Sequence, residues 1–202
     1  LGANGAGKTT LIKMLSGVLK PDFGEISLNS FSINTDRVIA QQQFGYLPES
    51  TIGYNPLTVY DFLEFAAKIR LLSTNLVGKA INRCLFQMDL EDVSDQQLWQ
   101  LSKGMRQRVW LAQCLVHDPS ILFLDEPTDG LDPIQKQKTR KIIKEAGIEK
   151  IILMSTHILE EAELLCDHLI IMRRGQLVAS GPKTKFEDRQ GRIEAQILPL
   201  IS

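Results

Sequence analysis

The residues best suited to chemistry fall in a few short segments, and the first of these is rich in glycine. Gly2–Thr9 fits the pattern G-x-x-x-x-G-K-S/T and runs into a helical pattern with Leu11, Met14 and Leu15 on one face. Glycines allow a tight turn that points several backbone N–H groups at one anion, and a helix N-terminus adds partial positive charge. The segment therefore predicts a phosphate loop whose binding residues are Gly2, Ala3, Asn4, Gly5, Ala6, Gly7, Lys8, Thr9 and Thr10.

Two side chains of this loop have specific predicted roles. Lys8 is expected to reach the β- and γ-phosphates of a nucleoside triphosphate, and the Thr9 hydroxyl is expected to bind Mg²⁺. The alternative is an ordinary glycine-rich turn before a helix. That alternative is disfavoured because Lys8 and Thr9 both fall where the pattern requires them.

A second segment ends an apolar run in two acids. Ile121–Leu124 is continuously apolar, which is typical of a strand buried on both faces of a parallel sheet, and Asp125 and Glu126 follow it. Ligands of such sheets bind at the carboxyl ends of the strands. We therefore expect Asp125 to lie near Mg²⁺, directly or through water, and Glu126 to orient and deprotonate the attacking water. The alternative is a buried strand that enters a polar turn.

A third segment, Leu101-Ser-Lys-Gly-Met105, carries a family resemblance. It resembles the signature motif of the ATP-binding-cassette (ABC) ATPases, usually written LSGGQ, and the order of the motifs matches that family over nearly the whole chain. Lys103 and Met105 depart from the pattern, whereas Ser102 and Gly104, the pair that faces phosphate in the family, are retained. The resemblance implies that Ser102 and Gly104 of one subunit close over ATP held by another. Ser102 is also a predicted helix N-cap.

Three further residues acquire roles from this resemblance. Glu49, in Gly45–Glu49, stands where the family usually has a glutamine near Mg²⁺, so it is implied as a nucleotide and metal contact; a solvated turn acid is the alternative. Asp132 would reach across a dimer interface, and it is also a predicted N-cap with proline at the first helical position. His157 resembles the histidine that contacts the γ-phosphate and, with Glu126, completes the catalytic pair.

The elements that must position these residues follow an α/β pattern. Apolar strand patterns alternate with helices, which predicts a doubly wound α/β core; they lie at Glu25–Leu28, Gln43–Leu47, Ile121–Leu124, Ile151–Ser155 and Leu169–Arg173. Residues from about 55 to 116 are instead predicted to form an all-helical insert, with the signature motif at its edge. The predicted fold is a P-loop NTPase core with an inserted helical signature subdomain, as a single ABC ATPase domain over residues 1–202.

Two local features refine this organisation. Residues 173–181 are predicted to form a hairpin around Gly175. Only Leu1 precedes the phosphate loop, whereas the motif expects a strand there, so we expect the first strands to be missing, together with the aromatic residue that stacks on adenine in the family. The aromatic side chains of Tyr54, Tyr60, Phe62 and Phe65 could line a groove for a membrane subunit, although core packing explains Phe62 equally well.

The composition is ordinary for a globular chain. The sequence has 202 residues, 44% hydrophobic content and a net charge of −1, which gives no global reason to expect nucleic-acid binding. No apolar run is long enough to span a membrane. The cysteines are scattered without a C-x-x-C pair, which fits a reducing compartment, and all sit in apolar helical patterns expected to bury them: Cys84, Cys114 and Cys166.

The resemblance implies a Mg²⁺-dependent, ATP-hydrolysing subunit of an exporter-like ABC transporter. Its implied ligands are ATP and Mg²⁺, and its implied partners are a transmembrane permease subunit and a second ATP-binding subunit, in a homo- or heterodimer. It would lie in the cytoplasm, peripheral on the inner face of the cell membrane. The alternatives are a soluble ABC ATPase acting on ribosomes or DNA, and a degenerate ATP-binding scaffold.

Overall fold

The computed structural model describes residues 1–51, 53–54 and 56–201. Its centre is a parallel sheet in the order β3-β4-β5, with Phe44 opposite Ile121 and Ile121 opposite Ile151. Every residue of the middle strand is buried, as expected for a strand covered on both faces. The strands of this sheet are β3 (Phe44–Leu47), β4 (Ile121–Asp125) and β5 (Ile151–Ser155).

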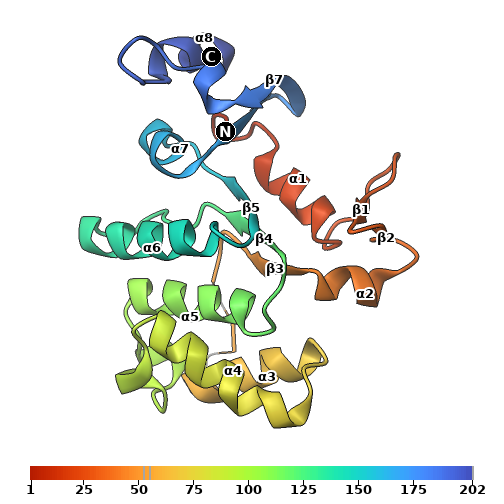
Figure 1. The fold of residues 1–202 in the computed structure, drawn as a ribbon, viewed down its shortest axis with the longest axis vertical. Helices are drawn as coiled ribbons and strands as arrows, with labels where there is room; N and C mark the ends of the chain where they lie inside the picture. The colour runs from red at the N-terminus through yellow and green to blue at the C-terminus, as the bar shows by residue number, and fades with distance from the viewer. Residues whose placement is uncertain (52, 55, 202) are drawn as a thin grey trace.

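Helices lie on both sides of this sheet (Figure 1). The helix that begins in the phosphate loop packs against β4 and β5, and the helices that follow β4 and β5 pack against each other. Asp132 caps the first of these two by accepting hydrogen bonds from the backbone N–H groups of Ile134 and Gln135, both at 3.0 Å. These helices are α1 (Lys8–Leu15), α6 (Pro133–Ala146) and α7 (Leu159–Leu165), with α2 (Arg37–Gln42) before β3.

Two antiparallel hairpins flank the core. The predicted hairpin around Gly175 is present as β6 (His168–Arg173) and β7 (Gln176–Pro182), followed by η3 (Lys183–Lys185) and α8 (Glu194–Ile201). The strand predicted at Glu25–Leu28 is shorter than expected: β1 (Ser27–Leu28) pairs with β2 (Phe31–Ser32) instead of joining the parallel sheet. A tight turn with positive φ at Asn29 and Ser30 forces this local pairing.

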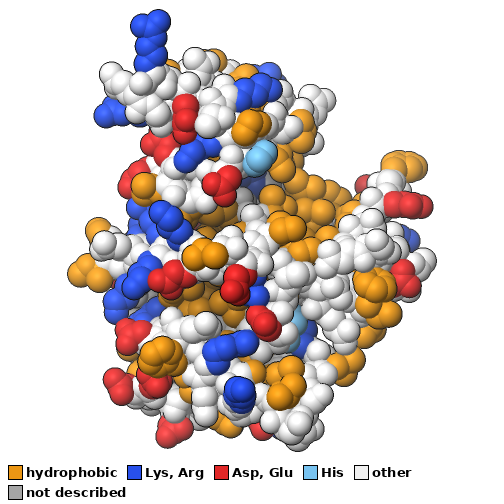
Figure 2. Space-filling view, viewed as in Figure 1, with side chains coloured by type: hydrophobic (Ala, Val, Ile, Leu, Met, Phe, Trp, Pro, Cys, Tyr) orange, Lys and Arg blue, Asp and Glu red, His pale blue; other side chains and the backbone are white. Residues whose placement is uncertain are grey.

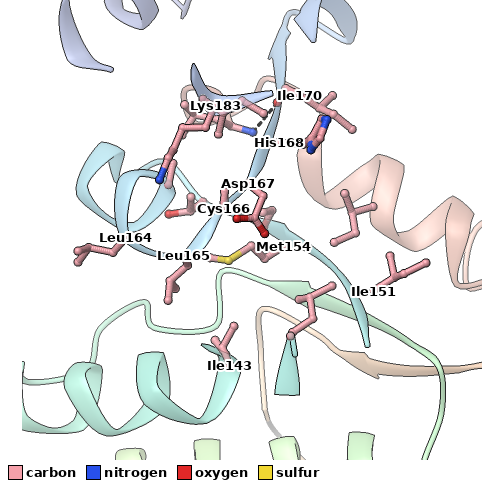
Figure 3. Close-up of a pocket in the computed structure, with 18 of the residues that line it drawn as sticks. Ile143, Ile151, Met154, Leu164, Leu165, Cys166, Asp167, His168, Ile170 and Lys183 are labelled. Atoms are coloured by element: carbon pink, nitrogen blue, oxygen red, sulfur yellow. Dashed lines mark hydrogen bonds between the residues drawn. The ribbon is translucent and has the colours of Figure 1, made fainter. Parts of the chain in front are cut away.

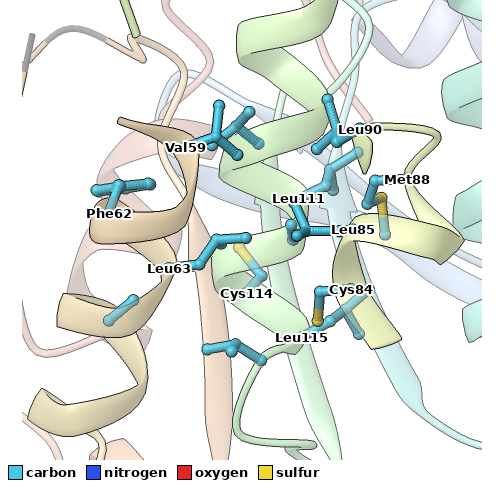
Figure 4. Close-up of a cluster of buried hydrophobic side chains, with 14 of the residues drawn as sticks. Val59, Phe62, Leu63, Cys84, Leu85, Met88, Leu90, Leu111, Cys114 and Leu115 are labelled. Atoms are coloured by element: carbon cyan, nitrogen blue, oxygen red, sulfur yellow. The ribbon is translucent and has the colours of Figure 1, made fainter. Parts of the chain in front are cut away.

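The segment between β3 and β4 is helical in the structure. Thr58 caps its first helix by accepting from the N–H of Asp61, and Ser102 caps its last helix by accepting from the N–H of Met105. Their apolar faces meet in one core, in which Figure 4 shows Val59, Leu63, Leu85 and Leu111 converging. The elements are α3 (Val59–Ile69), α4 (Thr74–Gln87), η1 (Glu91–Val93), η2 (Leu98–Gln100) and α5 (Lys103–Leu115). Residue 55, where the predicted insert begins, lies outside the described residues.

The last of these helices, α5, rests directly on the sheet. A Cβ at Gly45 of β3 would lie only 2.2 Å from the carbonyl oxygen of Cys114, so the two backbones touch where glycine leaves room. Nearby, Nε2 of His117, for which no role was predicted, donates to the carbonyl oxygen of Phe44 at 3.2 Å. Burial lowers the pKa of His117 to about 4, so its ring is neutral near pH 7.

A cavity of about 670 Å³ opens between β5 and the β6–β7 hairpin (Figure 3). Leu1 borders it and extends along β6, since its amino group donates to the carbonyl oxygen of Ile170 and its own carbonyl accepts from the N–H of Met172. Most of the lining side chains are apolar, and β5, β6 and α7 contribute several of them, including Ile151 and Leu165.

The cysteine prediction is wrong at one position. Cys84 and Cys114 are buried in helices, but Cys166 is only half-buried, follows the last residue of α7 and borders this cavity. The helical pattern continued one residue too far because the chain turns into an extended conformation at Cys166. Throughout the described residues, no helix has the length and apolar character needed to cross a membrane.

The contact of α5 with β3 predicts a stability change for Gly45→Ala. The added methyl group would collide with the backbone of Cys114, so the free energy of unfolding should fall by about 1–3 kcal/mol in urea denaturation. The matched control is Gly78→Ala in α4, where an added Cβ meets nothing within 4 Å. That control should raise stability by up to about 1 kcal/mol, because alanine is the better helix former. Equal effects of the two substitutions would show that α5 and β3 do not pack as described.

Candidate functional site

The phosphate loop folds back over its own lysine. Gly5 and Gly7 adopt positive φ values of 79° and 98°, and the N–H of Ala6 donates to the carbonyl oxygen of Ala3 at 3.1 Å. The ammonium group of Lys8 donates to the carbonyl oxygens of Gly2 at 2.8 Å and Ala3 at 3.1 Å. The positive charge is therefore held beneath the loop, at the N-terminus of α1, where an anion is favoured.

The hairpin supports this loop from the other side. A Cβ at Gly2 would lie 2.4 Å from the carbonyl oxygen of Met172, and one at Gly7 would lie 3.3 Å from Cα of Gly175. The N–H of Gly175 donates to the carbonyl oxygen of Ala6 at 2.9 Å. The glycines thus permit a close approach of two backbones, which the sequence pattern did not reveal.

The first acid after β4 is fully buried and linked to both neighbouring elements. Oδ1 of Asp125 accepts from the hydroxyl of Thr9 at 3.1 Å and from the hydroxyl of Ser155 at 2.5 Å. Its other oxygen, Oδ2, is buried and has no hydrogen-bond partner within the described part of the chain. A buried, unpaired carboxylate oxygen is costly unless a cation occupies the space beside it.

The residues around Asp125 fit Mg²⁺. Magnesium prefers hard oxygen ligands and is usually held in nucleotide sites by one or two protein oxygens together with substrate phosphates. The unpaired Oδ2 of Asp125 and the adjacent hydroxyl of Thr9 supply oxygens of this kind at the mouth of the phosphate loop.

Glu126 lies between the lysine and the predicted histidine. Its Oε1 is 3.5 Å from Nζ of Lys8, and its Oε2 is 3.0 Å from Nδ1 of His157. The backbone of Glu126 has φ 47°, a strained value for a non-glycine residue, and its N–H donates to the hydroxyl of Ser155 at 2.9 Å. The structure therefore brings Lys8, Thr9, Asp125, Glu126 and His157 into one cluster.

Glu49 does not join this cluster. It is exposed and forms no hydrogen bond or ion pair among the residues that the structure describes. It lies just past β3, at the same edge of the sheet as Asp125, and both charges act on Tyr46. Burial, with a smaller effect of Asp125 and then of Cys114 and Glu49, raises the pKa of Tyr46 to about 12, so this phenol stays neutral.

The signature residues gather at a second place. Ser102 caps α5, Asp132 caps α6, and Gly104 contacts the side chain of Gln135, which a Cβ at Gly104 would approach to 2.6 Å. Within the described residues, no hydrogen bond of Ser102 or Asp132 reaches the phosphate loop. The predicted binding residues therefore form two separate groups in one chain.

A hydrogen bond connects the signature helix to the loop after Glu126. The buried side chain of Gln107, one turn into the signature helix α5, donates to the carbonyl oxygen of Pro127 at 2.7 Å. Pro127 directly follows Glu126. The signature helix therefore holds the loop that carries the candidate general base.

Sequence comparison then gives the family. The family described as "ABC transporter" matches residues 1–129 of the chain. The chain belongs to this family. A curated relative from Nostoc sp. (strain PCC 7120), named "Uncharacterized ABC transporter ATP-binding protein all4389", is 42% identical over 201 residues, which cover 97% of this chain and 59% of the relative.

Solved ABC structures share the fold. "Structure of ATP binding subunit of ABC transporter" aligns with a TM-score of 0.88 and 30% identity, covering 100% of this ABC chain and 86% of that one. CbiO1 from Clostridium perfringens aligns with a TM-score of 0.80 and 29% identity, covering 94% and 78% of the two chains. These likenesses confirm the predicted α/β fold of the P-loop NTPase type. The chain spans 59%, 51% and 63% of the length of three curated ABC relatives.

Sequence reasoning missed Ser155, which joins the two acids of the site. Its hydroxyl donates to Asp125 and accepts from the N–H of Glu126. Its position at the end of the predicted strand Ile151–Ser155 could have indicated this role, because neighbouring parallel strands end at the same edge of a sheet. In the structure Asp125 is opposite Ser155.

The bridging hydroxyl makes Ser155→Ala informative. The substitution leaves the N–H of Glu126 without its acceptor and removes a donor from Asp125, so stability should fall by about 1–3 kcal/mol in urea unfolding without nucleotide. The control is Ser16→Ala, another buried serine, whose hydroxyl only donates to the carbonyl oxygen of Lys13. An effect of Ser155→Ala no larger than that of Ser16→Ala would contradict the bridging role.

Proposed function

We propose that this ABC chain is the ATP-binding and ATP-hydrolysing subunit of a transporter. The observation that carries the proposal is the cluster in which Lys8, Glu126 and His157 meet at the N-terminus of α1, beside Thr9 and Asp125. Phosphate binding needs a positive, donor-rich loop, and hydrolysis needs a base beside it. Lys8 is supplied by the start of α1, and Glu126 and His157 follow the ends of β4 and β5.

Binding would be the work of the phosphate loop. The loop and the first turn of α1 offer backbone N–H groups to the phosphates, and Lys8 adds a full positive charge. In the structure Lys8 is bonded to the loop carbonyls of Gly2 and Ala3. The lysine is thus already ordered beneath the loop, which lowers the entropic cost of contacting a phosphate.

Water activation would fall to Glu126 with His157. A water held by the Glu126 carboxylate would give it a proton as the water attacks the terminal phosphate. The ammonium of Lys8, 3.5 Å from Oε1 of Glu126, holds this carboxylate beside the phosphate loop. His157, bonded to the other carboxylate oxygen, keeps the side chain aimed in one direction and would contact the γ-phosphate.

Thr9 and Asp125 would hold Mg²⁺ when it is bound. The ion would supply positive charge that stabilises the phosphates as they separate. We propose Glu49 as a further contact to the nucleotide or its Mg²⁺, because it follows β3 at the same edge of the sheet as Asp125.

The second group of residues would act on another copy. Ser102, Gly104 and Asp132 lie at the starts of α5 and α6, apart from the phosphate loop of their own chain. Helix N-termini favour anions, so these residues would close over ATP held by a second ATP-binding subunit. Two subunits, identical or different, would then enclose ATP between them.

A transmembrane permease is the proposed partner in transport. The similar protein CbiO1 is described as part of the ABC transporter complex cbiONQ. In this chain, a groove of about 320 Å³ lies between the sheet and α3, with Phe62 at 5.3 Å from Tyr54 and 5.2 Å from Trp110 between ring centroids. We propose that the permease contacts this groove and that the subunit lies at the cytoplasmic face of the membrane.

The groove differs from its predicted composition. Tyr54, Phe62 and Phe65 border this groove, and Phe62 also packs in the core of the helical segment, being 2% exposed. Tyr60 packs against that core and does not border the groove, whereas Trp110 of α5 does. Helix periodicity explains the difference, because Tyr60 points to another side of α3 than Phe62 and Phe65.

A soluble ABC ATPase acting on ribosomes or DNA is not favoured. The Nostoc relative is named as an ABC transporter ATP-binding protein, and the similar solved structure is described as the ATP binding subunit of an ABC transporter. The face in Figure 2 also mixes basic and acidic side chains rather than presenting a field of one sign, and the net charge is −1.

Lys8→Ala should weaken nucleotide binding itself. Removing the charge beneath the loop should lower the affinity of the full-length protein for ATP by roughly tenfold or more, measured by titration with a fluorescent ATP analogue. The control is Lys13→Ala, an exposed lysine on the same helix, which should bind normally. Unchanged affinity in Lys8→Ala would remove the loop from the proposed site.

Glu126→Gln should separate binding from turnover. The amide cannot take a proton from water, so kcat should fall by roughly 10²-fold or more while ATP affinity stays within about twofold. The variant should also accumulate as an ATP-bound dimer on size-exclusion chromatography. Glu149→Gln, at an exposed acid on the same chain, should keep full turnover. Undiminished hydrolysis in Glu126→Gln would refute the assignment of the general base.

A further inference from the structure

A second buried acid stands behind the candidate site. Glu161, in the first turn of α7, is 1% exposed, although it carries a carboxylate and has no role in the proposed chemistry. Acids are rarely buried this completely unless hydrogen bonds or charges compensate them. The partners of Glu161 therefore indicate what the burial achieves.

Both oxygens of this carboxylate are used. The hydroxyl of Thr128 donates to Oε1 in a short hydrogen bond, and the hydroxyl of Thr156 donates to Oε2 at 2.9 Å. Nη2 of Arg140, from α6, is 3.5 Å from Oε1. Thr128 and Thr156 are themselves 1% and 2% exposed, so the network is shielded from water. Hydrogen bonds to a charged acceptor are stronger than those between neutral groups.

The two threonines belong to the loops that carry the candidate reacting groups. Thr128 follows Glu126 by two residues, and Thr156 immediately precedes His157. The hydroxyl of Thr156 also accepts from the N–H of Ile158, on the far side of His157. One carboxylate thus fastens the loop after β4 and the loop after β5 to each other.

We propose that Glu161 is a positioning residue for ATP hydrolysis. By holding Thr128 and Thr156 at a common anchor, it fixes the separation of the two loops and so maintains the 3.0 Å contact between Glu126 and His157. It touches neither of those side chains and acts only through the threonines. The inference rests on the proposed function, in which Glu126 and His157 work together. Small displacements of such groups carry a large cost in rate.

The chain offers a matched control beside Glu161. Glu160 also pairs with Arg140, at 3.0 Å, but its side chain is 65% exposed, and the hydroxyls of Thr128 and Thr156 donate to Glu161 rather than to it. Glu161→Gln and Glu160→Gln therefore each remove one carboxylate that pairs with Arg140. Only Glu161→Gln deprives the threonine hydroxyls of a carboxylate that can accept from both.

The kinetic test compares these variants in the full-length protein. Glu161→Gln should lower kcat roughly tenfold with KM for ATP within about twofold, whereas Glu160→Gln should leave both values near those of the wild type. Thr156→Val should show the same fall in kcat. Thr156→Ser, which keeps the hydroxyl, should have a kcat near that of the wild type. The double variant Glu161→Gln/Thr156→Val should be no slower than either single variant, because both break one unit.

A second readout needs no nucleotide. Hydrogen exchange followed by mass spectrometry should show faster exchange in Glu161→Gln over residues 126–131 and 155–158, and unchanged exchange there in Glu160→Gln. Wild-type kcat in Glu161→Gln, or exchange that rises evenly over the whole chain, would overturn the positioning role. If the wild type itself fails to hydrolyse ATP, the proposed function fails, and the exchange experiment still decides whether Glu161 fastens the two loops.

Discussion

The buried carboxylate of Asp125 is the group on which the geometry of the site depends. A charge removed from water at the end of β4 must be compensated, and the compensation comes from Thr9 of α1 and Ser155 of β5. These hydrogen bonds hold the phosphate loop, the acidic strand and the strand before His157 at fixed separations. The second oxygen, Oδ2, is buried without a hydrogen-bond partner among the described residues, and this is the position at which we propose that Mg²⁺ binds.

Glu126 shows how the same framework constrains the backbone. Its φ of 47° costs energy for a residue with a side chain, and it persists because Ser155 binds its N–H while Gln107 binds the next carbonyl. The carboxylate is then directed between Lys8 and His157. Because Gln107 belongs to the signature helix, a shift of that helix relative to the sheet would reach the loop after Glu126 through a single hydrogen bond. Packing and chemistry are therefore coupled at this turn.

The sequence could predict most of the parallel core and the ends of its strands, because apolar runs, glycines and capping residues act locally. The N-caps Ser102 and Asp132 and the cluster of Lys8, Thr9, Asp125, Glu126 and His157 belong to this class. Ser155 and Glu161 escaped notice because Ser155 bonds to Glu126, 29 residues away, and Glu161 bonds to Thr128, 33 residues away, and these pairings are set by strand register and helix packing. The short β1–β2 pairing was missed for a related reason, since a local turn at Asn29 and Ser30 overrode the strand pattern.

The gap between β5 and β6 links the cavity to the phosphate loop. Within the described residues β5 ends its sheet at the cavity, and on the other side the backbone of Leu1 pairs with β6. The edge of a sheet presents N–H and C=O groups that can pair with a further strand. A strand seated in the gap would bond to the edge of β5, and it would also stiffen the phosphate loop, which begins directly after Leu1.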